Sequence, residues 1–156
     1  MDAKFAKLVE SLAPKLKELV DMPPLSNGKL PARMPWSGVY LFSEPSGKHL
    51  YVGRSNDLRG RYGRHCRPGA THRQAAFAFR LARIATGFTE ATYTQEGGRA
   101  WLIEQPKFRE AFIAAKAFIR SLEYRYVEET DQNKQALLEI YAAVVLDTPH
   151  NDFGTH

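Results

Sequence analysis

The chain has 156 residues and a single cysteine, Cys66, which excludes an internal disulfide and a zinc site built from several cysteines. Its length suits one ordinary domain and is too short for two independent cores. Lysine and arginine outnumber aspartate and glutamate by 22 to 17, and the formal charge of +5 favours polyanionic partners, nucleic acid before an anionic membrane.

The N-terminal residues are predicted to form a helix and a linker. Apolar residues recur at helical spacing from Ala3 to Val20, which predicts an amphipathic accessory helix that Pro14 kinks or divides. Charges interrupt this segment too often for a signal peptide or a membrane span, so we expect a soluble, cytoplasmic protein. A proline-rich stretch follows, and we place the boundary between this region, residues 1–35, and the main domain, residues 36–156, near Trp36.

A β-hairpin is predicted at the start of the main domain. β-branched and aromatic residues flank the turn formers Glu44-Pro45-Ser46-Gly47. If these four residues form the loop, Ser43 pairs with Lys48 and Tyr40 lies directly opposite Tyr51. The tyrosines then face outward, while the other face carries the apolar residues Val39, Leu41, Leu50 and Val52.

Helices dominate the rest of the chain. A short basic helix is expected after Gly53, with Ser55 or Asn56 as its cap. Further helices are predicted over about 74–86, ended by Gly87, and over 106–119, followed by a strand at 122–127. Asp131 can cap a last helix that runs to about Leu146, and the stretch 88–105 is ambiguous.

The basic helix carries the densest positive charge in the chain. Arg61 and His65 are four residues apart and therefore share a helix face. An arginine offers a planar fork of N–H donors to a phosphoryl group during displacement. The neighbouring arginines are candidate nucleic-acid contacts: Arg54, Arg59, Arg64, Arg67 and Arg73. The alternatives are a solvated basic face and, in the hairpin, a tyrosine pair that merely packs.

Glu139 is the only charged residue of the apolar run ALLEIYAAVVL. No lysine or arginine lies at helical spacing to pair with it, and burying an unpaired carboxylate is costly. A hard divalent cation, or Arg61 from elsewhere in the fold, would satisfy it. Alternatively, Glu139 lies on the solvent edge of its helix. A weaker metal candidate in the C-terminal tail lacks a closed ligand set and comprises His150, Asp152 and His156.

Taken together, these residues resemble the motifs of the GIY-YIG nucleases over roughly residues 36–153. Gly38-Val39-Tyr40 and Tyr51-Val52-Gly53 are similar to the two motifs of the family name, with valine in place of isoleucine. Arg61 falls on the family's arginine, and Glu139 falls on its metal-binding glutamate. Pro149-His150-Asn151 is similar to the Pro-x-Asn that trails that glutamate.

The resemblance implies an α/β (α+β) fold with a small three-stranded antiparallel central sheet flanked by helices. Residues 122–127 would supply the third strand. The N-terminal helix is extra to this fold, and residues 70–119 are expected to be a helical insertion.

The resemblance also implies an endonuclease that hydrolyses phosphodiester bonds in DNA with a single Mg²⁺ or Mn²⁺ held by Glu139. Arg61 would neutralise charge on the phosphate, Tyr40 would deprotonate or orient the attacking water, and Tyr51 would position water or phosphate. His65, which should titrate near neutral pH, is an alternative base. Supporting roles fall to Gly53, Ser55 and Asn151.

Two other functions remain open at this point. A non-catalytic nucleic-acid-binding module could keep the same scaffold and bind in a salt-dependent manner without cleavage. An interaction protein could use its N-terminal amphipathic helix and need no nucleic acid. The sequence indicates neither an oligomeric state nor the DNA structure that is cut.

Overall fold

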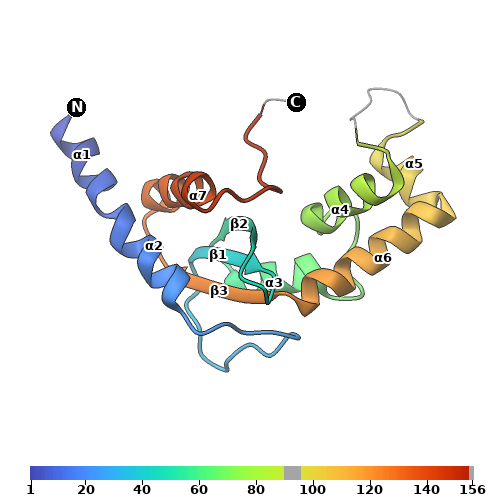
Figure 1. The fold of residues 1–156 in the computed structure, drawn as a ribbon, viewed down its shortest axis with the longest axis horizontal. Coiled ribbons are helices and arrows are strands. Elements are labelled where there is room, and N and C mark those ends of the chain that lie inside the picture. Colours follow the sequence, from blue (N-terminus) through green and yellow to red (C-terminus); the bar gives the residue numbers. More distant parts are fainter. Residues whose placement is uncertain (90–95, 155–156) are drawn as a thin grey trace. The chain divides into compact units, whose positions relative to one another are not determined.

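The computed structural model describes residues 1–89 and 96–154 (Figure 1). The N-terminal helices are α1 (Ala3–Glu10) and α2 (Leu12–Asp21), and the hairpin strands are β1 (Gly38–Ser43) and β2 (His49–Ser55). The elements that follow in the chain are α3 (Leu58–Cys66), α4 (Ala76–Thr86), α5 (Arg99–Glu104), α6 (Pro106–Ser121), β3 (Glu123–Glu128) and α7 (Gln132–Leu146).

The chain folds as two compact units, which are described separately. The first, here called the sheet unit, comprises Met1–Arg59 and Leu122–Asn151. The second, here called the helical unit, comprises Gly60–Ser121 and Asp152–His156. Most of α3, the whole of α4 to α6 and the predicted insertion therefore fall in the helical unit.

The sheet has three antiparallel strands in the order β2-β1-β3, as the family resemblance implied. The predicted hairpin register was wrong by two residues. A bulge between Phe42 and Ser43 brings Phe42 opposite Tyr51 and Tyr40 opposite Gly53. Because side chains alternate with a period of two, a shift of two residues keeps Tyr40 and Tyr51 on the same face.

The core of the sheet unit lies on the opposite face, against helices α2 and α7. Its strand residues are Val39, Leu41, Val52 and Val127, and its helix residues are Leu12, Leu16, Leu19, Leu138 and Ala142. The apolar face of the hairpin was predicted correctly. The expectation of an accessory N-terminal helix is wrong for α2, because its leucines are buried in this core, whereas α1 has no buried residue.

The N-terminal helix divides at Ser11 and not at Pro14. Pro14 lies in the first turn of α2, where the missing N–H has no intrahelical partner to lose. Continuing α1 through Pro14 would instead remove a hydrogen bond to Glu10 and crowd its carbonyl. The break three residues earlier, where the Ser11 hydroxyl donates to the Leu8 carbonyl at 2.6 Å, avoids both costs.

The helical unit is built on α4 and α6, which pack through aromatic residues. The rings of Phe79 and Phe108 have centroids 5.0 Å apart, and both side chains are buried. Gly87 ends α4 at φ +82°, as its position in the sequence predicted. Lys116 is buried, and its ammonium donates to the carbonyls of Pro68 and Ala70 at 2.7 and 2.8 Å.

Other predictions concern single elements. Asp131 caps α7 by accepting from the Lys134 N–H at 2.9 Å, as predicted. The ambiguous stretch contains α5, and residues 90–95 of it lie outside the described residues. Among the helices in the described ranges, none combines the length and the apolar character needed to cross a membrane.

Candidate active site on the sheet unit

Tyr40 and Tyr51 form the centre of the candidate site. Their ring centroids are 6.4 Å apart, and the Tyr40 ring also lies 5.9 Å from those of Phe42 and Tyr124. Tyr40 is only 1% exposed, so the expectation that both tyrosines face outward is wrong for this one. Tyr51 is partly exposed. The packing around Tyr40 holds its ring in one place beside a tyrosine that solvent can reach.

Both motif glycines are explained by close approaches of neighbouring atoms. A Cβ on Gly53 would lie 2.2 Å from the Tyr40 hydroxyl oxygen, on the strand directly opposite. A Cβ on Gly38 would lie 2.0 Å from the carbonyl oxygen of Val127 on β3. Any larger residue at Gly53 would therefore displace the packed phenol, which makes this glycine part of how Tyr40 is positioned.

Asn151 holds the outer edge of the sheet at the second motif. Its Oδ1 accepts from the Val52 N–H at 2.8 Å, and its Nδ2 donates to the Val52 carbonyl at 2.7 Å. The Thr148 hydroxyl also donates to Oδ1 at 2.7 Å. Since β2 is an edge strand, this amide satisfies backbone groups that the sheet leaves unpaired. Asn151 thus fixes the residue between Tyr51 and Gly53.

Glu139 lies on α7 and is neither fully buried nor unpaired. Its side chain is 22% exposed, and its Oε2 accepts a hydrogen bond from Arg54 Nε at 3.0 Å. The sequence predicted that this carboxylate has a partner, either a divalent cation or Arg61. In the structure the partner is Arg54. Arg54 comes from the end of β2, and its side chain is 42% exposed. The ion pair ties the glutamate to the strand that carries Tyr51.

A network of amide side chains, which the sequence analysis missed, supports the same helix. The Asn56 amide exchanges hydrogen bonds of 3.0 and 2.9 Å with Gln132, and its Oδ1 also accepts from Gln135 at 3.0 Å. Gln135 is buried and donates to the Glu129 carbonyl at 2.6 Å. The network joins the end of β2 to the first turn of α7, one turn before Glu139. A glutamine at a buried helix position was the available signal.

Ser55 and Asn56 do not play the part expected of a helix cap. Ser55 Oγ accepts from the Asp57 N–H at 2.9 Å, which closes a local turn ahead of α3. Asn56 is committed to the amide network described above. Both residues therefore shape the connection between β2 and α3.

His65 is completely buried in the helical unit, where its ring lies 6.3 Å from that of Phe77. Burial, followed by the charges of Arg61 and Arg64, lowers the pKa of His65 to about 3. The expectation that this imidazole titrates near neutral pH is therefore wrong. Burial likewise raises the pKa of the neighbouring Cys66 thiol.

The remaining predicted arginines divide between the units. Arg59 donates to the Pro31 carbonyl within the sheet unit. Arg61 and the other three, Arg64, Arg67 and Arg73, belong to the helical unit. That unit has 11 Lys and Arg residues against 5 Asp and Glu, a charge of +6, whereas the sheet unit has 11 against 12, a charge of −1. The net positive charge of the protein thus lies in the helical unit.

Glu139 is the one carboxylate that the motifs offer to a metal ion. Within residues 1–89 and 96–154, no three His, Cys, Asp or Glu side chains gather closely enough to hold one. The C-terminal candidate cannot be assessed as a set, because His156 lies outside the described residues. A site with a single protein carboxylate suits Mg²⁺, which keeps several waters and shares substrate phosphates.

The antiparallel three-stranded sheet with its flanking helices defines an α+β domain, and the motif residues lie on β1, β2 and α7. The family model of the GIY-YIG catalytic domain matches residues 37–142, which is more than half of the chain. The chain therefore belongs to the GIY-YIG family, whose members are nucleases that act on nucleic acids. Searches of curated proteins and of solved structures found no significant match.

Proposed function

We propose that this protein is a metal-dependent endonuclease that hydrolyses phosphodiester bonds in DNA with a single Mg²⁺ or Mn²⁺. One observation carries the proposal. The sheet unit brings Tyr40 and Tyr51 into ring contact on one face of the sheet, and Arg54 ties Glu139, on α7, to β2, the strand that carries Tyr51. Three motif groups are therefore held by one small sheet and the helix packed on it.

Glu139 is the residue that would hold the cation. Its carboxylate is partly exposed, so water and a substrate phosphate can complete the coordination of an ion that needs few protein ligands. When bound, the cation supplies Lewis-acid stabilisation of negative charge on the scissile phosphate. Arg54 now neutralises this carboxylate and would be released toward the DNA backbone, which agrees with its predicted role as a nucleic-acid contact.

The other motif residues supply positioning and proton transfer. We assign Tyr40 to orienting or deprotonating the attacking water and Tyr51 to positioning water or phosphate by hydrogen bonding. His65 is not chosen as the base, because its imidazole is buried away from solvent and a pKa of about 3 makes it a weak proton acceptor. We assign Arg61 to neutralising the charge on the phosphate, because of its position in the motif.

The test is plasmid nicking by the purified protein with Mg²⁺ or Mn²⁺, and with EDTA in place of metal. Glu139→Gln keeps the size of the side chain and can still accept from Arg54, but removes the charge that would hold the cation. We expect nicking to fall by on the order of 1,000-fold, the loss that corresponds to several kcal/mol of charge stabilisation. Glu10→Gln, at an exposed position on α1, is the matched control. Nicking by Glu139→Gln at the parental rate would refute the assignment.

A non-catalytic nucleic-acid-binding module is the second candidate. The Arg54–Glu139 pair favours it, because an arginine that neutralises the carboxylate competes with a cation for it. This function predicts tight, salt-dependent DNA binding in EDTA and no nicking of any substrate with either metal.

A further inference from the structure

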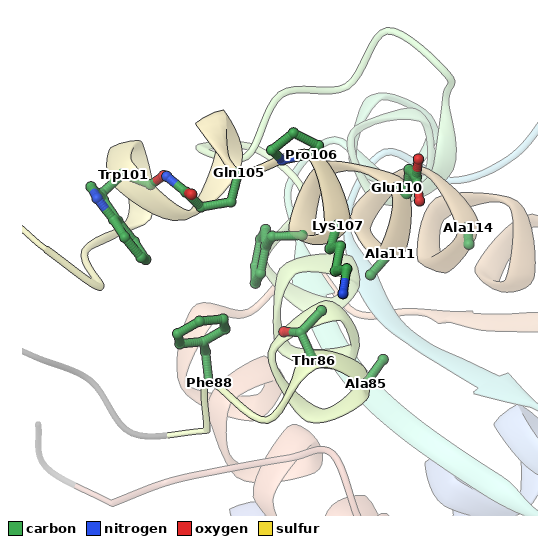
Figure 2. Close-up of a pocket in the computed structure, with 11 residues that line it drawn as sticks. Ala85, Thr86, Phe88, Trp101, Gln105, Pro106, Lys107, Glu110, Ala111 and Ala114 are labelled. Carbon is green, nitrogen blue, oxygen red and sulfur yellow. The ribbon is translucent and has the colours of Figure 1, made fainter.

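The helical unit contains an open pocket of about 970 Å³ between the end of α4 and the helices α5 and α6. Figure 2 shows Phe88 and Thr86 on one wall and Trp101, Gln105 and Lys107 on the other. Its size lies at the upper end of the range of small-ligand pockets. None of the motif residues of the candidate active site lines it.

Two aromatic rings flank this pocket and remain accessible. The ring centroids of Phe88 and Trp101 are 6.0 Å apart at an interplanar angle of 76°. Phe88 is 42% exposed, although the same unit buries Phe77, Phe79 and Phe108 almost completely. Accessible aromatic faces at a concave site are suited to stacking against a flat ligand.

Two arginines lie over the ring of Phe79, which packs against the pocket-lining Phe108. The guanidinium carbons of Arg99 and Arg83 lie 4.5 and 5.1 Å from the centroid of the Phe79 ring. That ring in turn lies 5.0 Å from the ring of Phe108, which lines the pocket. The contacts place two cations on one aromatic residue that touches the pocket lining.

Backbone carbonyls hold both guanidinium groups in place. Arg83 Nη1 donates to the carbonyl of Phe88 at 3.1 Å, and Arg99 Nη1 donates to the carbonyl of His72 at 2.8 Å. Burial and then the charge of Arg99 lower the pKa of Arg83, and burial, followed by the charges of Arg73 and Arg99, lowers the pKa of His72. Crowded like charges of this kind are stabilised when a polyanion lies beside them.

We infer that this pocket and its arginine pair bind an unpaired nucleotide, with the base against Phe88 and Trp101 and the phosphate against Arg83 and Arg99. An aromatic platform beside cations is the combination that single-stranded nucleic acid requires. The polar groups of Gln105, at the pocket wall, can meet the edge of a base. The inference rests on the proposed function and extends it, because it names substrates that present an unpaired strand.

An apolar protein side chain is the competing occupant of such a pocket. Two observations favour a nucleotide. The surrounding unit has a charge of +6 and places Lys107 in the pocket lining, and hydrogen bonds to backbone carbonyls hold the guanidinium groups of Arg83 and Arg99. A neutral apolar partner would gain nothing from either feature.

Tryptophan fluorescence provides a direct test, because the chain has two tryptophans and one of them lines the pocket. Trp36 is 76% exposed, so Trp36→Phe leaves Trp101 as the single reporter. This protein is titrated in EDTA with an oligothymidylate and with an abasic strand that has the same number of phosphates. We expect the oligothymidylate to quench Trp101 and the abasic strand to bind more weakly without quenching.

Two substitutions separate stacking from charge. Phe88→Ala should weaken oligothymidylate binding about tenfold or more and leave its salt dependence unchanged. Arg99→Gln should weaken binding and lower the slope of log affinity against log salt by about 0.7. Arg120→Gln, at the exposed C-terminal end of α6, is the charge-matched control and should retain quenching. Phe88→Tyr keeps the ring and should bind like the parent, and circular dichroism checks that each variant is folded.

Equal quenching by the abasic strand, or parental affinity in folded Phe88→Ala, would overturn the inference. Unchanged Trp101 emission at a saturating concentration of the oligothymidylate would also overturn it. The pocket would then be a site for an apolar protein partner. Plasmid nicking with Mg²⁺ is measured in parallel. Nicking without a Trp101 response refutes the pocket alone, whereas a Trp101 response without nicking refutes the nuclease function and supports the pocket.

Discussion

The sheet unit and the helical unit treat their charged residues in opposite ways. In the sheet unit, Glu139 is paired with Arg54, and nearby amide groups bond to one another and to the backbone. In the helical unit, arginines crowd on one phenylalanine, and basic residues greatly outnumber acidic ones. Satisfied groups keep catalytic side chains in place, whereas an excess of one charge attracts a polyanion. Under the proposed function, positioning for chemistry and attraction of nucleic acid are therefore assigned to different parts of the chain.

Among substitutions in the helical unit, we expect the largest loss of activity at Arg61. This arginine lies in the helical unit but is proposed to take part in the chemistry. Arg61→Ala should lower the turnover of metal-dependent nicking by about 100- to 1,000-fold, since it removes a donor to charge that develops on the phosphate. DNA affinity, measured in EDTA, should fall far less. Arg67→Ala removes an exposed arginine outside the motif and serves as the control. Equal losses in both variants would make Arg61 one more contact for nucleic acid.

A pair of glycines, one in each unit, compares the packing inside the sheet unit with that inside the helical unit. Gly53→Ala places a methyl group against the packed Tyr40 ring and should lower the free energy of unfolding by about 3 kcal/mol. Gly63→Ala, within α3, meets no atom within 4 Å and should raise it by about 0.5–1 kcal/mol. Urea unfolding of the two variants measures both effects. A neutral Gly53→Ala would mean that Tyr40 is free to move.

Asn151 should contribute to stability through the edge of the sheet. Asn151→Ala leaves the Val52 N–H and carbonyl without their amide partner, which should cost about 1–3 kcal/mol. Asn133→Ala, at an exposed position of α7, should change stability by less than about 0.5 kcal/mol. If thermal or urea unfolding shows no difference between the two, the proposed clamp on β2 is not a source of stability.

His65 should have the smallest effect at neutral pH and a distinct effect in acid. Its folded-state pKa of about 3 lies below the ordinary value of 6.5, so between these values the unfolded chain binds a proton that the folded chain does not. Stability therefore falls as the pH drops below 6.5, with a slope approaching about 1.4 kcal/mol per pH unit. Urea unfolding at several pH values should show a shallower slope for His65→Phe. A folded His65→Phe that no longer nicks DNA would restore His65 as the candidate base.

Local signals in the sequence were sufficient for most of the elements. The cap at Asp131, the αL glycine at Gly87 and the alternation along β1 each depend on a few neighbouring residues. Motif spacing then identified the family, and the roles of the motif tyrosines, arginine and glutamate stay predictions. The prediction that Pro14 itself kinks or divides the helix was less accurate. A proline is tolerated in the first turn of a helix, and the local sequence does not show where the second helix begins.

By itself, the sequence determined the family, the helical and strand segments and the separation of motif residues along the chain. Only the tertiary structure decided the bulge that sets the hairpin register, the burial of Tyr40 and His65, and the choice of Arg54 as the partner of Glu139. It also decided that Phe88 and Trp101 line one pocket and that Arg83 and Arg99 both lie over the ring of Phe79. The physical reason is the same throughout: propensity and periodicity act within a few residues, whereas burial, pKa and ion pairing depend on atoms that folding brings together.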